Sequence, residues 1–397
     1  MLPDGWKSTT LGEMNLDISD GNYSSKYPCA SDFVKSGIPF LRANNIQSGT
    51  VNDEDMRYIS IQKHDELQKG HLKKEDILIT TRGDIGQISI TPERHINSNI
   101  NAQIVRINSN NLQINLYLFY YLSLCKINNK FEPLTTGTAL KQLPIGRLKL
   151  LPILLPPLSE QKKIAAILST WDRAIEGTEK LLANSQQQKK ALMQQLLTGK
   201  KRLPGFTGEW IWKRSKEIFK SISIKNNPNT CELLSVTQDQ GVVPRSSLDR
   251  RVVMPDGSVQ GYKLVNPGNF IISLRSFQGG LEYSYYRGLV SPAYTVLDNK
   301  IEMENEFYKF YFKSYDFIGH LAVATIGIRD GKQISYEDFS FIKLPYPPLP
   351  EQKAIAAVLT TADEEITSLE SDLSRLRQEK KALMQQLLTG KRRVRVN

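Results

Sequence analysis

Apolar residues recur at alternating spacings of four and three in two long stretches of the chain. These stretches run from the proline pairs at 156–157 and 347–348 to Gly199 and Gly390. Such a spacing, kept for more than four heptads, predicts a long helix with one apolar stripe. Proline before the start, glutamate in the first turn, and glycine followed by lysine at the end are typical helix boundaries. Each helix is expected to span about 38 residues and about 57 Å.

The two stretches are copies of one another. Residues 189–200 recur letter for letter at 380–391, and about 29 of the 47 positions aligned between 156–202 and 347–393 are identical, which indicates internal duplication. A solitary helix with a leucine stripe needs a partner, and its own copy is the nearest candidate. We therefore predict that the two helices pair with one another; two unrelated surface helices would leave both stripes uncovered. The residues predicted to form the helix pair or to dock partners are Ile164, Leu168, Trp171, Ile175, Leu182, Leu192, Leu196, Ile355, Leu359, Ile366, Leu373, Leu383 and Leu387.

The segments that precede the two helices have mixed strand and loop character. In the first segment, β-rich runs at 51–61, 76–81, 87–90 and 103–107 alternate with turn residues, and an aromatic-rich helix is expected at 116–124. The aromatic residues of this helix and of its counterpart favour core packing over stacking on single-stranded nucleic acid, because they have helical spacing and apolar neighbours. They are Tyr117, Phe119, Tyr120, Tyr121, Phe307, Tyr308, Phe310 and Tyr311.

Short motifs of the first segment recur in the second. Residues 101–105 match 292–296 and residues 141–143 match 332–334, both at an offset of 191, and Trp6-Lys7 resembles Trp212-Lys213. We therefore predict an α+β fold with an internal pseudo-two-fold repeat. Two mixed α/β domains, residues 1–155 and 203–346, alternate with helical regions at 156–202 and 347–397.

The composition and charge of the chain indicate which class of partner to expect. The net charge of +11 and a pI of about 9.3 favour a polyanion such as nucleic acid. Three widely spaced cysteines argue against a disulfide framework or a zinc site. The longest apolar run, Leu116 to Cys125, is too short to span a bilayer and no signal peptide is recognised, so we expect a cytoplasmic protein.

Motifs of the enzymes that act on DNA are incomplete in this chain. Ser291-Pro292-Ala293-Tyr294 lacks the second proline of the turn that adenine methyltransferases use, and it is expected to begin a strand. Gly199-Lys200-Lys201 lacks the other residues of a phosphate loop. Glu160-Gln161-Lys162 has no partner aspartate at strand spacing and is interpreted as the first helical turn. The four histidines show no ligand spacing. We expect no catalytic residue and no metal site.

The Pro-Pro-Leu-x-Glu-Gln-Lys helix start, the Leu-Leu-Thr-Gly-Lys helix end and the run from Gly37 to Ile46 carry a resemblance. Over essentially its whole length the chain resembles the specificity subunit of type I restriction-modification systems. The resemblance implies two target recognition domains, each reading one half of a split double-stranded DNA site. It implies that the two helices form an antiparallel coiled coil, which sets the spacer and docks two adenine methyltransferase subunits. It also implies that motor-nuclease subunits complete the complex.

The same resemblance implies no cofactor on this chain, with S-adenosylmethionine, ATP and Mg on the partner subunits. One departure concerns Arg214-Ser215-Lys216, where the family usually has Leu-Gly, as in Thr10-Leu11-Gly12 of this sequence. The departure bears on where the second domain begins.

Candidate DNA-binding residues come from polar loops, because base edges and phosphates are contacted mainly by basic, amide and hydroxyl side chains. Arg82 and Arg275 follow matching strands, so a positioning or structural role is expected for both rather than sequence reading. For each candidate, a solvated loop residue is the competing interpretation. The candidates are Arg42, Asn44, Asn45, Thr81, Arg82, Thr138, Lys141 and Gln142 in the first domain, and Arg245, Arg250, Arg275, Ser276, Gln278, Arg329, Lys332 and Gln333 in the second.

Two questions stay open from the residues alone. The basic residues at 200–202 and 391–395 either contact phosphate or complement the helix ends. The alternative function is a coiled-coil adaptor without DNA contact, and a modification enzyme is a weaker third hypothesis. An affinity for DNA that falls steeply with salt would separate DNA recognition from the adaptor.

Overall fold

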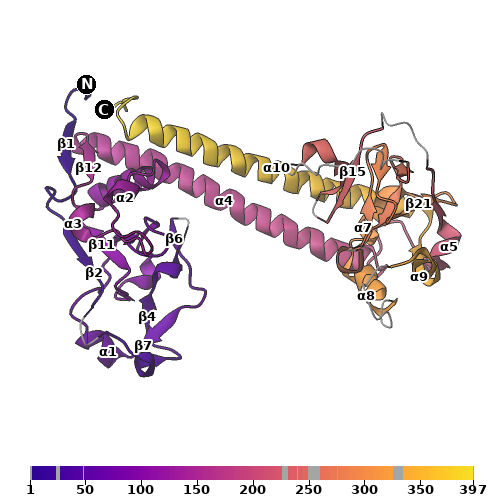
Figure 1. Ribbon diagram of the computed structural model, residues 1–397, viewed down its shortest axis with the longest axis horizontal. Coiled ribbons are helices and arrows are strands. Elements are labelled where there is room, and N and C mark those ends of the chain that lie inside the picture. Colours follow the sequence, from indigo (N-terminus) through magenta and orange to yellow (C-terminus); the bar gives the residue numbers. More distant parts are fainter. Residues whose placement is uncertain are drawn as a thin grey trace. The chain divides into compact units, whose positions relative to one another are not determined.

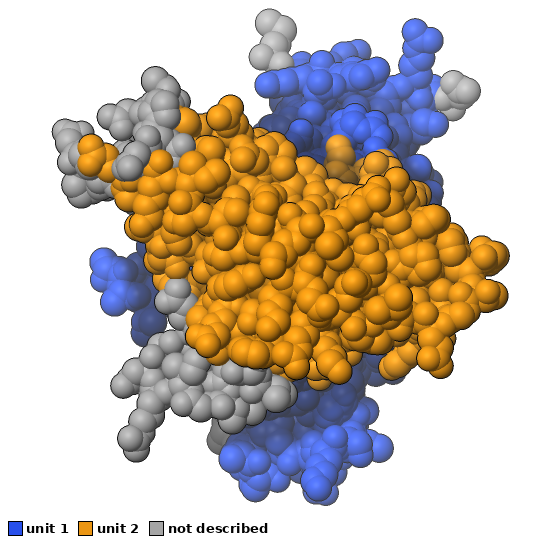
Figure 2. Space-filling view, turned by 90° about the vertical axis from the view of Figure 1, so that its right-hand side faces the viewer, with its two compact units in different colours: residues 1–178, 372–397 blue, residues 179–371 orange. Residues whose placement is uncertain are grey.

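The computed structural model of the chain describes residues 2–23, 27–47, 49–225, 231–238, 240–248, 260–274, 276–324 and 334–396. The chain divides into two compact units, coloured separately in Figure 2. Unit 1 comprises residues 1–178 and 372–397, and unit 2 comprises residues 179–371. Each unit therefore holds one globular segment together with half of each long helix.

The two long helices are present at the predicted places. Helix α4 spans Leu158–Leu196 and helix α10 spans Leu349–Leu387 (Figure 1). Each helix is 39 residues long. A glycine with a left-handed backbone follows shortly after the last residue of each helix, Gly199 (φ +70°) after Leu196 and Gly390 (φ +72°) after Leu387. Only glycine adopts this conformation without strain, which explains the sharp end of each helix.

The helices pair in antiparallel fashion within each unit. In unit 1, Lys380 near the end of α10 forms an ion pair with Asp172 in the first half of α4. In unit 2, the copies of these residues, Lys189 and Asp363, form the corresponding pair. Every residue predicted for the stripe is buried or half-buried. These observations agree with the predicted pairing.

Unit 1 is built on a four-stranded antiparallel sheet in the order β2-β11-β8-β9. Its strands are β2 (Asp17–Asp20), β11 (Ile104–Asn108), β8 (Ile77–Thr80) and β9 (Ile88–Ile90). Helix α2 (Leu112–Ile127) packs on the sheet through buried aromatic and leucine side chains. The predicted helix at 116–124 is thus confirmed, and it is longer at both ends.

A second sheet of unit 1 has the order β10-β4-β7-β3, with β10 parallel to β4. The predicted run at 51–61 is broken into β6 and β7 by a turn at Asp55, whose φ is +54°. The remaining elements of the unit before α4 are η1 (Ala30–Asp32), β3 (Phe33–Val34), β4 (Ile38–Leu41), η2 (Ala43–Asn45), β5 (Ile46–Gln47), β6 (Thr50–Val51), β7 (Arg57–Ile59), α1 (Ile61–Glu66), η3 (Glu93–His95), β10 (Asn99–Ile100), η4 (Glu132–Leu134) and α3 (Ile145–Leu148).

Unit 2 repeats the main sheet of unit 1. The order β14-β21-β18-β19 has the same antiparallel pairing as β2-β11-β8-β9. Helices α7 (Asn305–Tyr311) and α8 (Tyr315–Ala324) follow β21 as α2 follows β11. The other elements are α5 (Ser215–Ile218), β14 (Phe219–Ile222), β15 (Leu234–Thr237), β16 (Gly241–Pro244), η5 (Arg245–Ser247), β17 (Lys263–Val265), β18 (Phe270–Ile272), α6 (Ser276–Gly279), β19 (Glu282–Tyr283), β20 (Gly288–Val290), β21 (Thr295–Asn299) and α9 (Tyr336–Phe341). The predicted α+β class and internal repeat are confirmed.

The aromatic residues of the repeat lie in the cores, as predicted. Tyr117 and Tyr308 have no exposed surface, and their hydroxyls donate to the carbonyls of Leu154 (2.6 Å) and Pro345 (2.9 Å). Tyrosines buried in this way cannot stack on a nucleic acid. None of the helices in the described part of the chain combines the length and apolar character needed to cross a membrane.

A two-stranded antiparallel sheet precedes each long helix, and its register corrects one sequence match. Strand β1 (Lys7–Thr10) pairs with β12 (Pro152–Leu155), and β13 (Ile211–Arg214) pairs with β22 (Lys343–Tyr346). Lys7 lies opposite Leu155, and Ile211 lies opposite Tyr346, the copy of Leu155. The counterpart of Trp6 is therefore Trp210. The match to Trp212 was wrong because it compared letters and not strand register.

The same register places the residues that depart from the family pattern. Leu11 N donates to Leu151 O (2.9 Å), and Ser215 N donates to Ile342 O (2.8 Å). Since Leu151 and Ile342 are copies, Ser215 occupies the place of Leu11. Both residues are fully buried, and the Ser215 hydroxyl also donates to Ile342 O (2.8 Å). The departure changes one core side chain and leaves the strand pairing intact.

A buried carboxylate stands at the start of each long helix. In unit 2, Glu351 has no exposed surface and accepts hydrogen bonds from Arg202 Nε and Nη2, both at 2.6 Å, and from Trp210 Nε1 at 3.0 Å. In unit 1, Glu160 is 4% exposed and is paired in the same way with Arg393 and Trp6. Arg202 and Arg393 are thus engaged with buried glutamates, which is neither of the two roles left open for the basic residues at 200–202 and 391–395.

Removal of Arg202 tests the contribution of the buried pair. In Arg202→Ala, the Glu351 carboxylate stays buried without its cation, so we expect the free energy of unfolding of unit 2 to fall by about 3 kcal/mol. Urea unfolding followed by tryptophan fluorescence measures the loss. The control is Arg375→Ala, which removes an exposed arginine from a pair with Asp372 and should leave the urea midpoint unchanged. Equal midpoints for the two variants would contradict the prediction.

Candidate nucleic-acid interface

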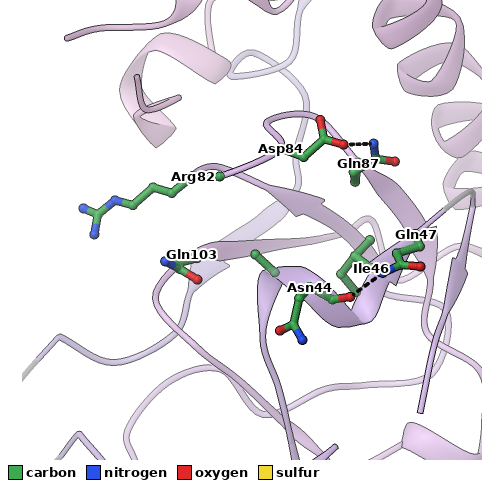
Figure 3. Close-up of a pocket in the computed structure, with 9 residues that line it drawn as sticks. Asn44, Ile46, Gln47, Arg82, Asp84, Gln87 and Gln103 are labelled. Carbon is green, nitrogen blue, oxygen red and sulfur yellow. Dashed lines mark hydrogen bonds between the residues drawn. The ribbon is translucent and has the colours of Figure 1, made fainter. Parts of the chain in front are cut away.

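Unit 1 contains a polar hollow of about 580 Å³ at one edge of its main sheet. Most of its polar lining consists of amide side chains with one arginine and one aspartate (Figure 3). The lining residues are Ala43, Asn44, Ile46, Gln47, Arg82, Gly83, Asp84, Gln87 and Gln103. Asn44 and Arg82 are sequence-predicted candidates for DNA contact.

Strand pairing explains why separate loops meet at this hollow. Strands β8 and β11 are antiparallel neighbours, so the residues that follow β8 lie beside the residues that precede β11. Thr81 N donates to Gln103 O at 2.7 Å, and the Thr81 hydroxyl donates to the same carbonyl at 3.0 Å. Asn101 N donates to Leu41 O (2.8 Å), which ties the end of β4 to the same edge. Three loops that are distant in sequence thus converge.

The turn after β4 separates the predicted residues by role. Asn45 has no exposed surface, and its amide nitrogen donates to the carbonyls of Asn52 and Glu54, both at 3.1 Å. Arg42 donates from its guanidinium to Asp55 O (2.6 Å) and from its backbone to Asn45 Oδ1 (2.9 Å). Arg42 and Asn45 therefore hold the turn together. Their neighbour Asn44 is exposed and lines the hollow.

Arg82 lies between two hollows. Its guanidinium stands 5.4 Å from the ring centre of Tyr23, an arrangement that orients a cation without a carboxylate. It lines the large hollow and also a smaller one of about 230 Å³, which Tyr23, Thr81 and Gln142 line as well. The positioning role expected for Arg82 stays a prediction.

The loop from Thr135 to Gln142 joins this surface. Thr136 and Gln142 exchange backbone hydrogen bonds of 2.8 and 2.9 Å. The backbones of Arg82 and Gln142 form an isolated antiparallel β-bridge. The loop tip, which includes Thr138 and Lys141, is exposed, although Lys141 forms an ion pair with Glu132. The predicted first-domain residues Arg82, Gln142 and Asn44 therefore share one polar surface.

One negative charge stands at the rim of the large hollow. A hydrogen bond from Gln87 (2.5 Å) and the Lys126 ammonium (3.1 Å) hold the pKa of Asp84 below its usual value. Asp84 is therefore ionised at neutral pH and is partly neutralised by Lys126. In Figure 3 the Arg82 guanidinium points away from Asp84. Among the described residues, Arg82 forms no ion pair, although Asp20 lines the smaller hollow with it.

Comparison with known proteins assigns this fold to a family. The sequence profile of the type I restriction modification DNA specificity domain matches residues 3–184 and 209–376. The chain belongs to the family of type I restriction-modification specificity subunits.

Relatives and a solved structure agree with the family. The chain is 27% identical to the putative type I restriction enzyme MjaX specificity subunit of Methanocaldococcus jannaschii, over 99% of this chain and 95% of that protein. It is 24% identical to the MjaVIII specificity subunit of the same organism, over 99% and 94%. The S subunit of a type I restriction-modification system from M. genitalium has a TM-score of 0.59 at 15% identity and covers 96% of both chains, which bears on the fold alone.

The second unit of this specificity subunit offers fewer placed candidates. The Arg245 guanidinium lies 5.9 Å from the ring centre of Tyr262 and is half-buried. Ser276 is buried and accepts a hydrogen bond from Ser273 N (2.8 Å), whereas Gln278 is exposed. The predicted residues Arg250, Arg275, Arg329, Lys332 and Gln333 lie outside the described residues.

Sequence reasoning missed Gln47, Gln87 and Gln103. Gln103 was treated as the first residue of a strand, although it directly precedes β11 at the same edge as Arg82. The pairing of the strands before and after these loops was the signal that could have found it. In the described part of the chain, no three His, Cys, Asp or Glu side chains are grouped to hold a metal ion. Burial also raises the pKa of the Cys125 thiol to about 12, which suppresses thiolate chemistry.

The orientation of Arg82 predicts a contact with phosphate. We expect Arg82→Ala to weaken binding of duplex DNA by a similar factor for every sequence, and to reduce the slope of log K against log salt by about 0.9. Fluorescence anisotropy across a salt series measures both quantities. Arg57→Ala is the matched control, because Arg57 also stacks on a ring of unit 1, that of Phe33, but does not line the hollow. An equal effect of the two variants would contradict the assignment.

Proposed function

We propose that this chain is the DNA sequence-recognition subunit of a type I restriction-modification complex. Each globular domain reads one half of a bipartite site in double-stranded DNA. The α4–α10 pair sets the spacer between the half-sites and docks two adenine methyltransferase subunits. Motor-nuclease subunits join the complete complex. The observation that carries this proposal is a repeated main sheet attached to nearly identical long helices, with loops that differ between the repeats.

The contrast between helices and loops supports the division of labour. Residues 189–200 and 380–391 are identical, so two copies of one partner can meet the same chemistry twice. The polar loops around the hollow of unit 1 match unit 2 only in part: Arg82 corresponds to Arg275, but Gln103 corresponds to Tyr294. Readers of different half-sites require loops that differ in this way. The net charge of +11 supplies attraction to the DNA backbone.

The surface of α4 offers a place for a partner in unit 2. A hollow of about 920 Å³ lies between the second half of α4 and the start of α8, and Lys190, Met193, Tyr315 and Ile318 are among its lining residues. Tyr315 is 84% exposed. An exposed tyrosine beside a methionine is typical of protein interfaces. This supports docking of a protein on the helical region.

We further propose that the chain supplies no catalytic group and acts in the cytoplasm. S-adenosylmethionine, ATP and Mg would bind the methyltransferase and motor-nuclease partners. The incomplete methylation, phosphate-loop and nuclease motifs support this assignment. In this division, the chain chooses the site and its partners perform the chemistry.

Loss of the gene should erase one methylation motif. We expect a genome-wide map of N6-methyladenine to lose one split, asymmetric motif in a host that lacks only this gene, compared with the same host that carries the gene and its neighbours. An unchanged map would favour the adaptor hypothesis. A salt series with purified chain and duplex DNA then decides, because an adaptor shows no affinity that falls steeply with salt.

Lengthening both helices should lengthen the spacer. Seven residues inserted after 178 and after 371 preserve the heptad stripe and add about 10 Å of helix, which corresponds to about 3 base pairs. We expect the same two half-sites separated by a longer gap in the methylation map. Insertion into α4 alone is the control, since it shifts one stripe against the other and should abolish methylation. An unchanged spacer would mean that the helices do not set it.

A further inference from the structure

The main chain of Gln103 is fixed at the rim of the hollow in unit 1. Its N–H donates to Asn101 Oδ1 at 3.1 Å, and its carbonyl accepts the two hydrogen bonds from Thr81. Asn101 is 5% exposed and Thr81 is 6% exposed, so these partners are themselves held in the protein. The Gln103 side chain therefore starts from a fixed point and extends into the hollow between Arg82 and Asn44 (Figure 3).

The hydrogen bonds also determine which end of the Gln103 amide is free. A backbone N–H is only a donor, so the Asn101 atom that meets it is the amide oxygen, and the other atom is nitrogen. That nitrogen donates to Gln103 Oε1 at 3.0 Å. The Gln103 oxygen is thus used inside the protein, and the side chain presents Nε2, a group that can only donate.

The other amides of the hollow differ from Gln103. Gln87 Nε2 donates to Asp84 (2.5 Å), and Gln47 Nε2 donates to the Asn44 carbonyl (2.9 Å), so a donor of each is used within the loops. Among the described residues, none bonds to the Asn44 carboxamide, which keeps both a donor and an acceptor for DNA. Gln103 is therefore the amide of this hollow whose acceptor is used and whose donors are presented.

We propose that Gln103 is a specificity-determining residue that donates from Nε2 to guanine or thymine at one position of the half-site read by unit 1. In the major groove, guanine presents the acceptors O6 and N7 and thymine presents the acceptor O4, whereas adenine places the donor N6 beside its acceptor N7 and cytosine presents the donor N4. A donor facing cytosine would leave two donors unpaired, which disfavours that base. This inference rests on the proposed function, because it names the base contact made by a DNA-reading surface.

A single substitution reverses this chemistry with little change in structure. In Gln103→Glu, one carboxylate oxygen still accepts from Asn101 Nδ2, while the group presented to DNA changes from a donor to an acceptor. Acidic side chains accept from cytosine N4. We expect the preference at one position of the half-site to move from guanine or thymine to cytosine, with a change in the affinity ratio of about tenfold or more. The second half-site should stay the same.

The experiment measures preference separately from total affinity. The wild-type motif is first mapped through N6-methyladenine in cells. The purified complex of each variant then competes for duplexes that differ at single positions of the first half-site. Gln68→Glu is the control, because it makes the same charge change at an exposed glutamine of unit 1 that does not line the hollow. Thermal melting verifies that each variant is folded.

The outcomes distinguish this inference from the function on which it rests. A reversed ratio in Gln103→Glu and an unchanged ratio in Gln68→Glu support it. An unchanged ratio in folded Gln103→Glu, or weaker binding by the same factor for every duplex, overturns it and indicates a phosphate contact or a structural role. The proposed function itself would fail in the first step, if methylation in wild-type cells did not depend on this gene.

Discussion

The need to cover two apolar stripes governs the rest of this structure. A helix of 39 residues with leucines on one side is not stable alone in water, because its apolar side must be buried. In unit 1, Ile164 and Leu168 of α4 share a core with Leu387 of α10. In unit 2, Ile355 and Leu359 of α10 share a core with Leu196 of α4. Each long helix therefore contributes its first half to one core and its second half to the other, and neither unit is complete without both helices.

Buried polar contacts repeat along this frame and leave the loops free to differ. Glu160 and Glu351 bind the arginine that follows the end of the other long helix and the tryptophan that precedes the first strand of their unit. Burying a carboxylate requires such partners, so these contacts constrain where helices and strands meet. The loops that line the hollow of unit 1 differ, because the carboxylate among their lining residues, that of Asp84, is exposed. Loop residues can therefore change while the frame is preserved.

The hollow of unit 1 shows how the frame positions a candidate reading surface. Residues that end β4, follow β8 and precede β11 meet because their strands are neighbours. Within this surface the internal hydrogen bonds assign roles: Arg42 and Asn45 hold a turn, Arg82 stacks on Tyr23, and Gln103 presents donors. Two side chains of the same type can thus differ in function according to which of their atoms are already bonded.

Periodicity and repetition in the sequence were enough to determine the two long helices, their ends, their mutual pairing, the α+β class and the repeat, because heptad spacing and flanking proline and glycine act locally along the chain. Family membership also followed from motifs at the helix ends. The strand register could not be predicted from the sequence alone. The sequence match therefore paired Trp6 with Trp212, whereas Trp210 makes the hydrogen bond equivalent to that of Trp6. The position of Gln103 at the hollow and the burial of Asn45 were likewise decided only by the tertiary structure. Both depend on which strands pair and which polar atoms are used internally, and these contacts join residues that are far apart along the chain.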